Sequence, residues 1–181
     1  MSGKLTLISS ATASGSASVE FTSGLDSTYD EYVFYFVDIH PSSDSVDFQT
    51  QFSTNAGSSY GMTITSTFWM AHHNPSNGSG AIIYQSSYDL AQSTSNQTLF
   101  RTLGDQPSES CAGEMHLFSP SSTSKVKHFY GVTQGVCSDP QSYENFSAGY
   151  VNDASNDIDA ARFTMSSGNI DAGTIYLFGV S

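Results

Sequence analysis

Tyr29-Asp-Glu-Tyr-Val-Phe-Tyr-Phe-Val-Asp-Ile-His40 is the longest nearly unbroken apolar run of the chain, and it decides the fold. Its residues are mostly aromatic or β-branched, which favours a strand over a helix. Read with a period of two, one face carries Tyr32, Phe34 and Phe36, and the other carries Val33, Tyr35, Val37 and Ile39. Because neither face is polar, we expect a central strand that a second sheet covers on one side. A loop, a helix or a neighbouring subunit would cover the other side.

The rest of the chain predicts about a dozen short strands separated by turns, with no helix of normal length. Segment 62–70 alternates and places Trp69 on a threonine-lined face, while segments 113–118 and 125–132 predict a hairpin. Segments 72–80 and 135–145 are expected to be loops. No linker or repeat divides the chain, so we predict a single domain over residues 1–181. Its expected fold is all-β, an antiparallel, jelly-roll-like β-sandwich.

The closing segment predicts a turn between two strands whose apolar residues lie in the core. Gly168 and Gly173 can adopt positive φ, and Asn169 tolerates it. A turn at these residues would let Phe163 and Met165 face Ile175 and Leu177.

Charge excludes several classes of partner. The 181 residues include 17 Asp and Glu but only 5 Lys and Arg, which gives a formal net charge of -12. Such a chain repels phosphate backbones and anionic lipid surfaces, so we expect neither nucleic acid nor membrane as a partner. No window resembles a signal peptide or a membrane span. The spacing of Cys111 and Cys137 leaves a disulfide between them open.

Metal-ligand patterns are weak in this sequence. The histidines His72, His73, His116 and His128 lack carboxylates or cysteines at metal-like spacing. An oxygen-rich cluster follows residue 152, but it has neither the glycine nor the closing glutamate of an EF-hand loop. The sequence therefore predicts no metal site and no cofactor. If a cation binds, we expect it to be calcium, with ligands from Asp153, Asn156, Asp157 and Asp159.

Catalytic patterns are also missing from the sequence. No Gly-x-Ser-x-Gly elbow is present. The neighbouring acids Asp30 and Glu31 would point to opposite faces of a strand, whereas glycoside hydrolysis needs two carboxyl groups facing across one cleft. We therefore expect no catalytic residue and no enzymatic activity.

Exposed aromatic residues are the remaining functional signal. Aromatic rings stack on sugar faces, and they also form the centres of protein interfaces. The residues that we expect to contact a glycan or a neighbouring subunit are Trp69, Tyr60, Tyr84, Tyr88 and Tyr35.

Three segments resemble virion structural proteins of tailed bacteriophages. Leu25-Asp-Ser-Thr-Tyr-Asp-Glu-Tyr-Val-Phe34 is similar to the YDEY strand of these proteins, and segment 114–129, with Phe118-Ser-Pro-Ser-Ser-Thr-Ser-Lys125, is similar to a hairpin of theirs. Segment 162–180, which contains Gly168-Asn-Ile-Asp-Ala-Gly-Thr-Ile-Tyr-Leu-Phe-Gly179, resembles their closing motif. The three occur in the expected order over nearly the whole chain.

The resemblance implies a non-enzymatic structural component of a bacteriophage virion. Such a protein is a capsid-decoration (cement) or tail-associated protein, is assembled in the cytoplasm of the bacterial host, and contacts other virion proteins. We expect a homo-oligomer, with a trimer as the first guess. The alternative is a carbohydrate-binding or receptor-binding β-sandwich that attaches to host-surface glycan.

Overall fold

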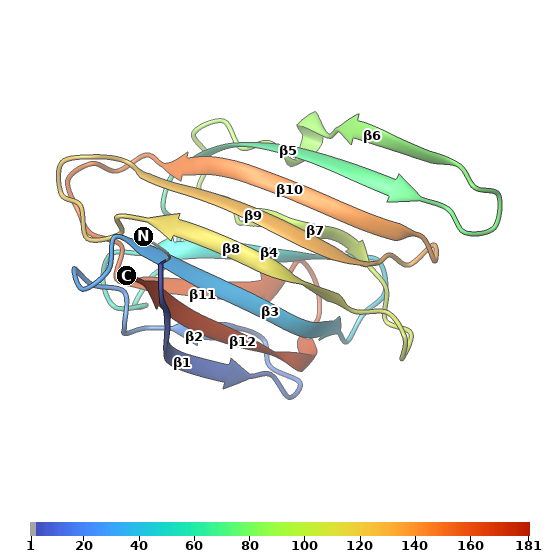
Figure 1. Ribbon diagram of the computed structural model, residues 1–181, viewed down its shortest axis with the longest axis horizontal. Coiled ribbons are helices and arrows are strands. Elements are labelled where there is room, and N and C mark those ends of the chain that lie inside the picture. Colours follow the sequence, from blue (N-terminus) through green and yellow to red (C-terminus); the bar gives the residue numbers. More distant parts are fainter. Residues whose placement is uncertain (1–2) are drawn as a thin grey trace.

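Two antiparallel sheets pack face to face in the computed structural model, which describes residues 3–181 (Figure 1). The eight-stranded large sheet has the order β1 (Leu5–Thr12), β12 (Ile170–Val180), β3 (Glu31–Pro41), β8 (Cys111–Phe118), β9 (Lys127–Val136), β10 (Ser142–Val151), β5 (Ile64–His73) and β6 (Gly80–Tyr84). The four-stranded small sheet has the order β2 (Val19–Phe21), β11 (Ala160–Met165), β4 (Val46–Ser53) and β7 (Gln97–Leu103). Within the described residues, one short 3-10 turn, η1 (Ser86–Tyr88), is the only helical element. The predicted all-β antiparallel sandwich is confirmed.

The apolar run quoted first forms β3, which lies between β12 and β8 in the large sheet. Tyr32, Phe34 and Phe36 are buried in the core between the sheets, as predicted. On the other face Val37 is 44% exposed. The prediction for Ile39 is wrong, because this residue is fully buried in the core. A register shift between Phe36 and Ile39, with Asp38 at φ 51, turns the strand over at that point.

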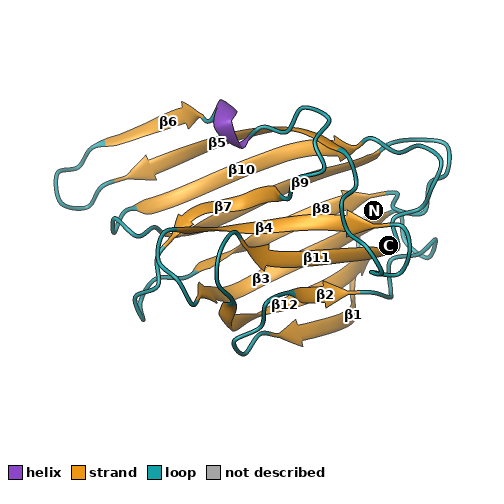
Figure 2. Ribbon diagram, turned by 180° about the vertical axis from the view of Figure 1, so that it is seen from behind, coloured by secondary structure: helices purple, strands orange, loops and turns teal. Residues whose placement is uncertain are grey.

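Phe163 of β11 lies at the centre of the core. The small sheet covers one part of the large sheet, and β5 and β6 extend beyond it (Figure 2). The Phe163 ring lies 5.1 Å from the ring of Phe34 and 5.3 Å from that of Phe36, both in the large sheet. It also contacts Phe21 and Phe48 of its own sheet. One aromatic cluster therefore joins the two sheets.

The closing turn connects the two sheets. Gly168 has φ 72, and a Cβ there would lie 2.5 Å from the Ser43 Oγ, so glycine is needed. Asn169 donates its side-chain N–H to the Gly15 carbonyl at 3.1 Å. The four apolar residues named for this segment all lie in the core, but they belong to two opposed sheets rather than to one hairpin: Phe163, Met165, Ile175 and Leu177.

Two expected loops are partly wrong. Segment 135–145 contains the end of β9 and the start of β10, so only residues 137–141 separate these strands. Segment 72–80 gives His72 and His73 to β5 and Gly80 to β6. In both places polar side chains occupy strand positions because their neighbours in the sheet supply the main-chain hydrogen bonds, and this pairing overrides local preference.

Candidate functional site

Aromatic side chains cover the outer side of the large sheet, away from the small sheet. Successive residues of a strand point to opposite faces, so each strand that buries one apolar set shows another on the outside. We call the following set the outer aromatic face: Tyr176 and Phe178 of β12, Tyr35 of β3, His116 and Phe118 of β8, His128 and Tyr130 of β9, Phe146 and Tyr150 of β10, and Trp69 of β5. All of these side chains are partly or largely exposed.

Ring stacking between neighbouring strands fixes this face. Trp69 stacks on Phe146 with ring centroids 4.1 Å apart and planes 5° apart. His116 stacks on Tyr130 at 4.5 Å and 11°. Because most of these rings contact a ring on the adjacent strand, few of their rotamers remain free, and a partner that binds here orders little further side-chain motion.

Two carboxylates lie within the outer aromatic face, on either side of His116. Its Nδ1 is 2.6 Å from the Glu31 Oε1, and its Nε2 is 3.3 Å from the Glu114 Oε1. Burial, followed by the nearby Glu114 carboxylate, raises the pKa of Tyr35 and of Tyr130 above the ordinary tyrosine value. Both phenols therefore remain hydrogen-bond donors throughout the physiological pH range.

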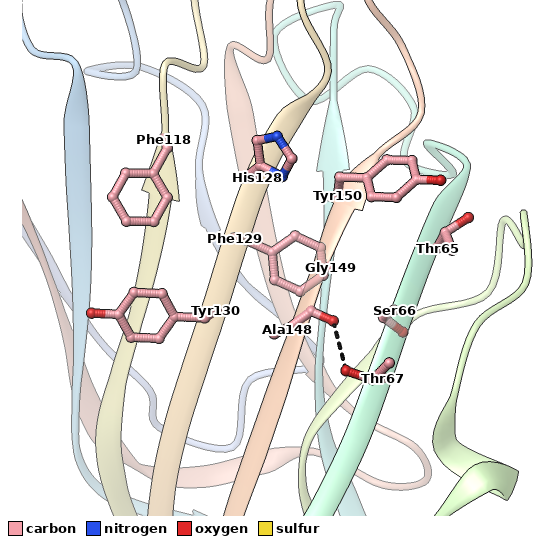
Figure 3. A pocket seen from close by; sticks show the side chains of 10 residues that line it. All are labelled: Thr65, Ser66, Thr67, Phe118, His128, Phe129, Tyr130, Ala148, Gly149 and Tyr150. Carbon is pink, nitrogen blue, oxygen red and sulfur yellow. Dashed lines mark hydrogen bonds between the residues drawn. The ribbon is translucent and has the colours of Figure 1, made fainter.

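A shallow hollow of about 490 Å³ interrupts the outer aromatic face (Figure 3). Tyr130 and Tyr150 lie on its two sides, and Ala148 forms the floor between them. Thr65 and Thr67 of β5 lie at its rim. Aromatic walls with hydroxyl groups at the rim suit an uncharged, partly apolar ligand such as a sugar ring.

The aromatic residues predicted from the sequence do not form one site. Trp69 and Tyr35 belong to the outer aromatic face, and Tyr84 lies opposite Trp69 on β6. Tyr88 of η1 packs instead against the Phe68 ring at 5.2 Å. Tyr60 is in a separate cluster beside the small sheet.

The surroundings of Tyr60 indicate a structural role. The Arg162 guanidinium lies 4.4 Å from the centre of its ring, and its hydroxyl donates a hydrogen bond to Glu20 at 3.3 Å. Burial, followed by the Glu20 charge, raises the pKa of Tyr60 to about 12. This phenol is engaged by its own chain and is not presented to a ligand.

Three of the four residues named for calcium have other partners. Asp153 accepts hydrogen bonds from the main-chain N–H groups of Ser155 and Asn156, and Asp159 accepts one from Ala56 at 2.9 Å. The carbonyls of Asp153 and Asn156 accept hydrogen bonds from the ammonium group of Lys127. The cationic group that this loop binds is therefore the Lys127 ammonium. Asp157 is exposed.

The other metal-type residues are dispersed in the same way. His72 pairs with Gln141 at 3.0 Å, and His116 pairs with the two glutamates. Cys111 and Cys137 are both buried and form no disulfide. Between residues 3 and 181, three ligand-type groups approach within 4.8 Å of one another only at Asp44, Asp105 and Glu109, which the sequence did not single out.

Comparison with protein-family models, with curated proteins and with solved structures finds no match for this chain. Among residues 3–181, no helix has the length and apolarity needed to cross a lipid bilayer.

Sequence reasoning missed much of the outer aromatic face. Phe146 escaped because a strand was expected only at residues 148–151, and Tyr150 lies in that short segment but was not singled out. Phe118 and Tyr130 were assigned to a hairpin, but nothing in the local pattern shows which side of a hairpin stays uncovered. The signal that could have found Phe146 and Tyr150 is the alternation of apolar residues at Phe146, Ala148 and Tyr150, which matches one side of a strand.

Proposed function

We propose that the chain is a non-enzymatic structural component of a bacteriophage virion, as a capsid-decoration (cement) or tail-associated protein. In this proposal it acts through protein–protein contacts of its outer aromatic face. The observation that carries the proposal is the extent of this face, which runs from β12 to β5 and remains partly exposed. Aromatic residues are enriched, and lysine depleted, at the centres of protein interfaces, and the outer aromatic face has this composition.

The position of the three virion-like segments supports the same proposal. They are far apart in the sequence, yet they supply β12, the start of β3, most of β8 and the start of β9, which are consecutive neighbours in the large sheet. They contribute His116, Phe118, His128, Tyr176 and Phe178 to the outer aromatic face. About half of the residues of the proposed interface therefore come from the segments that carry the resemblance.

Replacing Tyr130 by serine tests the proposal. Tyr130 contacts both His116 and Phe118 near the centre of the outer aromatic face and is itself exposed. Because aromatic residues at interface centres commonly contribute 2 kcal/mol or more, we expect incorporation of the variant into phage particles to fall by roughly tenfold or more. Quantitative immunoblotting of purified particles from complementation of a deletion phage would measure the incorporation.

Tyr60→Ser is the matched control, because Tyr60 lies beside the other sheet. It should be incorporated like the native chain, and circular dichroism should show that both variants fold. If the native protein were absent from purified particles, the proposed function would be overturned. Equal incorporation of Tyr130→Ser would remove the outer aromatic face as the contact surface.

The hollow beside Tyr150 favours a second candidate function, the binding of host-surface glycan. Its aromatic sides and threonine rim are the residue types that hold an uncharged sugar. We expect Tyr150→Ala to reduce glycan binding by roughly tenfold, since stacking on an aromatic ring contributes on the order of 1–2 kcal/mol. A glycan array followed by titration of each hit checks this, with Tyr60→Ala as the control. An array without hits for the native chain would contradict it.

A further inference from the structure

Strand β6 forms one free edge of the large sheet, with β5 as its single neighbour (Figure 1). It lies beyond the part of the large sheet that the small sheet covers (Figure 2). All five of its residues are exposed. Ile82 is 77% exposed, Tyr84 is 60% exposed and Ile83 is 37% exposed. Among residues 3–181, the two most exposed large apolar side chains, Ile82 and Tyr84, therefore lie on an open strand edge.

The opposite edge of the same sheet is protected, whereas β6 is not. Open strand edges tend to pair with other chains, and bulges, prolines or charged side chains normally prevent this. At the opposite edge, β1 has a register shift between Leu7 and Ser9 and follows Lys4. Strand β6 contains no proline and no charge, and it pairs with β5 through consecutive residues without a shift.

The charge distribution also permits a second copy to approach β6. The chain has a net charge of -12, so two copies repel each other over most of their surfaces. From Asn74 to Tyr88, however, the sequence contains no Asp, Glu, Lys, Arg or His. The hairpin that presents β6 is itself neutral. A charge does contact β6 at Tyr84, whose hydroxyl donates a hydrogen bond to the Asp89 carboxylate, so the repulsion at this edge comes from that end of the strand.

Hydrogen bonds at the two ends of the β5–β6 ladder show which main-chain groups point outward. The Gln85 N–H donates to the Phe68 carbonyl at 3.0 Å, and the Asn74 N–H donates to the Ser79 carbonyl at 2.7 Å. Residues of an antiparallel strand bond alternately to one side and to the other. Odd-numbered residues of β6 therefore bond to β5, and the main-chain groups of Gly80, Ile82 and Tyr84 face the open edge.

We propose that β6 pairs with β6 of a second copy of this chain, antiparallel and about a two-fold axis at Ile82. This register places Ile82 opposite itself, Gly80 opposite Tyr84, and Ala81 opposite Ile83. Away from the axis, small residues thus stand opposite large ones, and at the axis two isoleucines meet, which makes the strand complementary to itself. The outward-facing residues would form about six main-chain hydrogen bonds between the copies. The paired edges then join two large sheets into one.

The pairing rests on the strand edge alone and does not require the proposed function. It predicts a dimer instead of the trimer expected from the sequence, because a two-fold contact between strand edges is complete with two copies. Two-fold axes between antiparallel strands run perpendicular to the sheet. Both outer aromatic faces therefore point to the same side of the pair and are available to one common partner surface.

Single cysteines test the register. Ile82→Cys should form an intermolecular disulfide, because the axis places the two new thiols opposite each other at a Cα separation of about 5.5 Å, which a disulfide can span. Oxidised glutathione accepts the two electrons and two protons as the thiols join. Ile83→Cys is the matched control and should not cross-link, since its partner is Ala81. Cys111 and Cys137 are buried and should not react.

Light scattering on the native chain provides the second measurement, at concentrations from about 1 to 100 µM, where modest interfaces associate. We expect the mass of two chains of 19.4 kDa, a single chain for Ile82→Lys, and two chains for Leu7→Lys on the protected edge. A native monomer, a trimer, or equal cross-linking of both cysteine variants would overturn the pairing. If Ile82→Lys is a monomer but still joins particles, the proposed function does not depend on the pairing. If the native chain forms the β6 dimer but is absent from particles, the pairing holds and the proposed function fails.

Discussion

Replacing Phe163 by alanine is expected to lower the free energy of unfolding by about 3–5 kcal/mol. Phe163 is fully buried, and its ring contacts aromatic rings of both sheets, including Phe34 at 5.1 Å. Removing the ring loses its transfer free energy and leaves a cavity that rigid strands on both sides cannot close. Since a domain of this kind is stable by only about 5–15 kcal/mol, the loss should be visible at once in urea unfolding followed by circular dichroism.

Val37→Ala is the control for Phe163→Ala. Val37 is on β3, close to the same cluster in sequence, but its side chain is 44% exposed on the outer side. Its loss should change stability by roughly 0.5 kcal/mol or less. If Phe163→Ala lost less than about 1 kcal/mol, the packing of the two sheets around this ring would be contradicted.

Replacing Lys127 by methionine should cost about 3 kcal/mol of stability, the second largest effect expected. Lys127 is fully buried, and its ammonium donates hydrogen bonds to the carbonyls of Asp153, at 2.8 Å, and Asn156. Methionine keeps much of the volume but removes the ammonium donor from both partly buried hydrogen bonds. Hydrogen exchange should show earlier opening of residues 153–156. Lys125→Met, at an exposed lysine of the same hairpin, should have little effect.

The effect of Lys127→Met should also depend on pH. Burial lowers the pKa of the Lys127 ammonium below its ordinary value of 10.5, so the unfolded chain holds this proton more firmly than the folded one. The free energy of unfolding of the native chain should therefore increase as the pH rises from the folded-state pKa of Lys127 to 10.5. The variant has no lysine at this position and should lack this increase. Unfolding curves at pH 7 and at pH 10 compare the two chains. An identical pH dependence in both would contradict the assignment.

The fold class was predictable because most strands alternate and most turns contain Gly, Pro, Asn or Ser. What alternation cannot predict is a bulge, since Ile39 returns to the core through the positive φ of Asp38 rather than through its own chemistry. The start of β10 was predicted wrongly for another reason. Its inward residues include Asn145 and Ser147, which are buried although polar, so they interrupt the apolar inner face between Tyr143 and Val151.

The candidate site was less predictable than the fold. Trp69 and Tyr35 could be named because aromatic residues on a second strand face are visible locally. Whether Tyr60 or Tyr130 joins them depends on which strands become neighbours, and β3 pairs with β12 and β8, which are distant in sequence. Pairing between distant segments follows from the whole chain and cannot be read from any window of it.

Strand order has a consequence for synthesis on the ribosome. The last strand, β12, lies between β1 and β3, and the Lys4 N–H bonds to the Ser181 carbonyl at 2.8 Å. Translation proceeds from the N-terminus, so β3 emerges long before its neighbour β12 has been made. During that interval its apolar residues have no native cover on that side, and the large sheet can close only after residue 180 has left the exit tunnel. A nascent chain stalled before β12 has emerged should therefore be bound by chaperones or degraded, and folding of the large sheet should follow the emergence of β12.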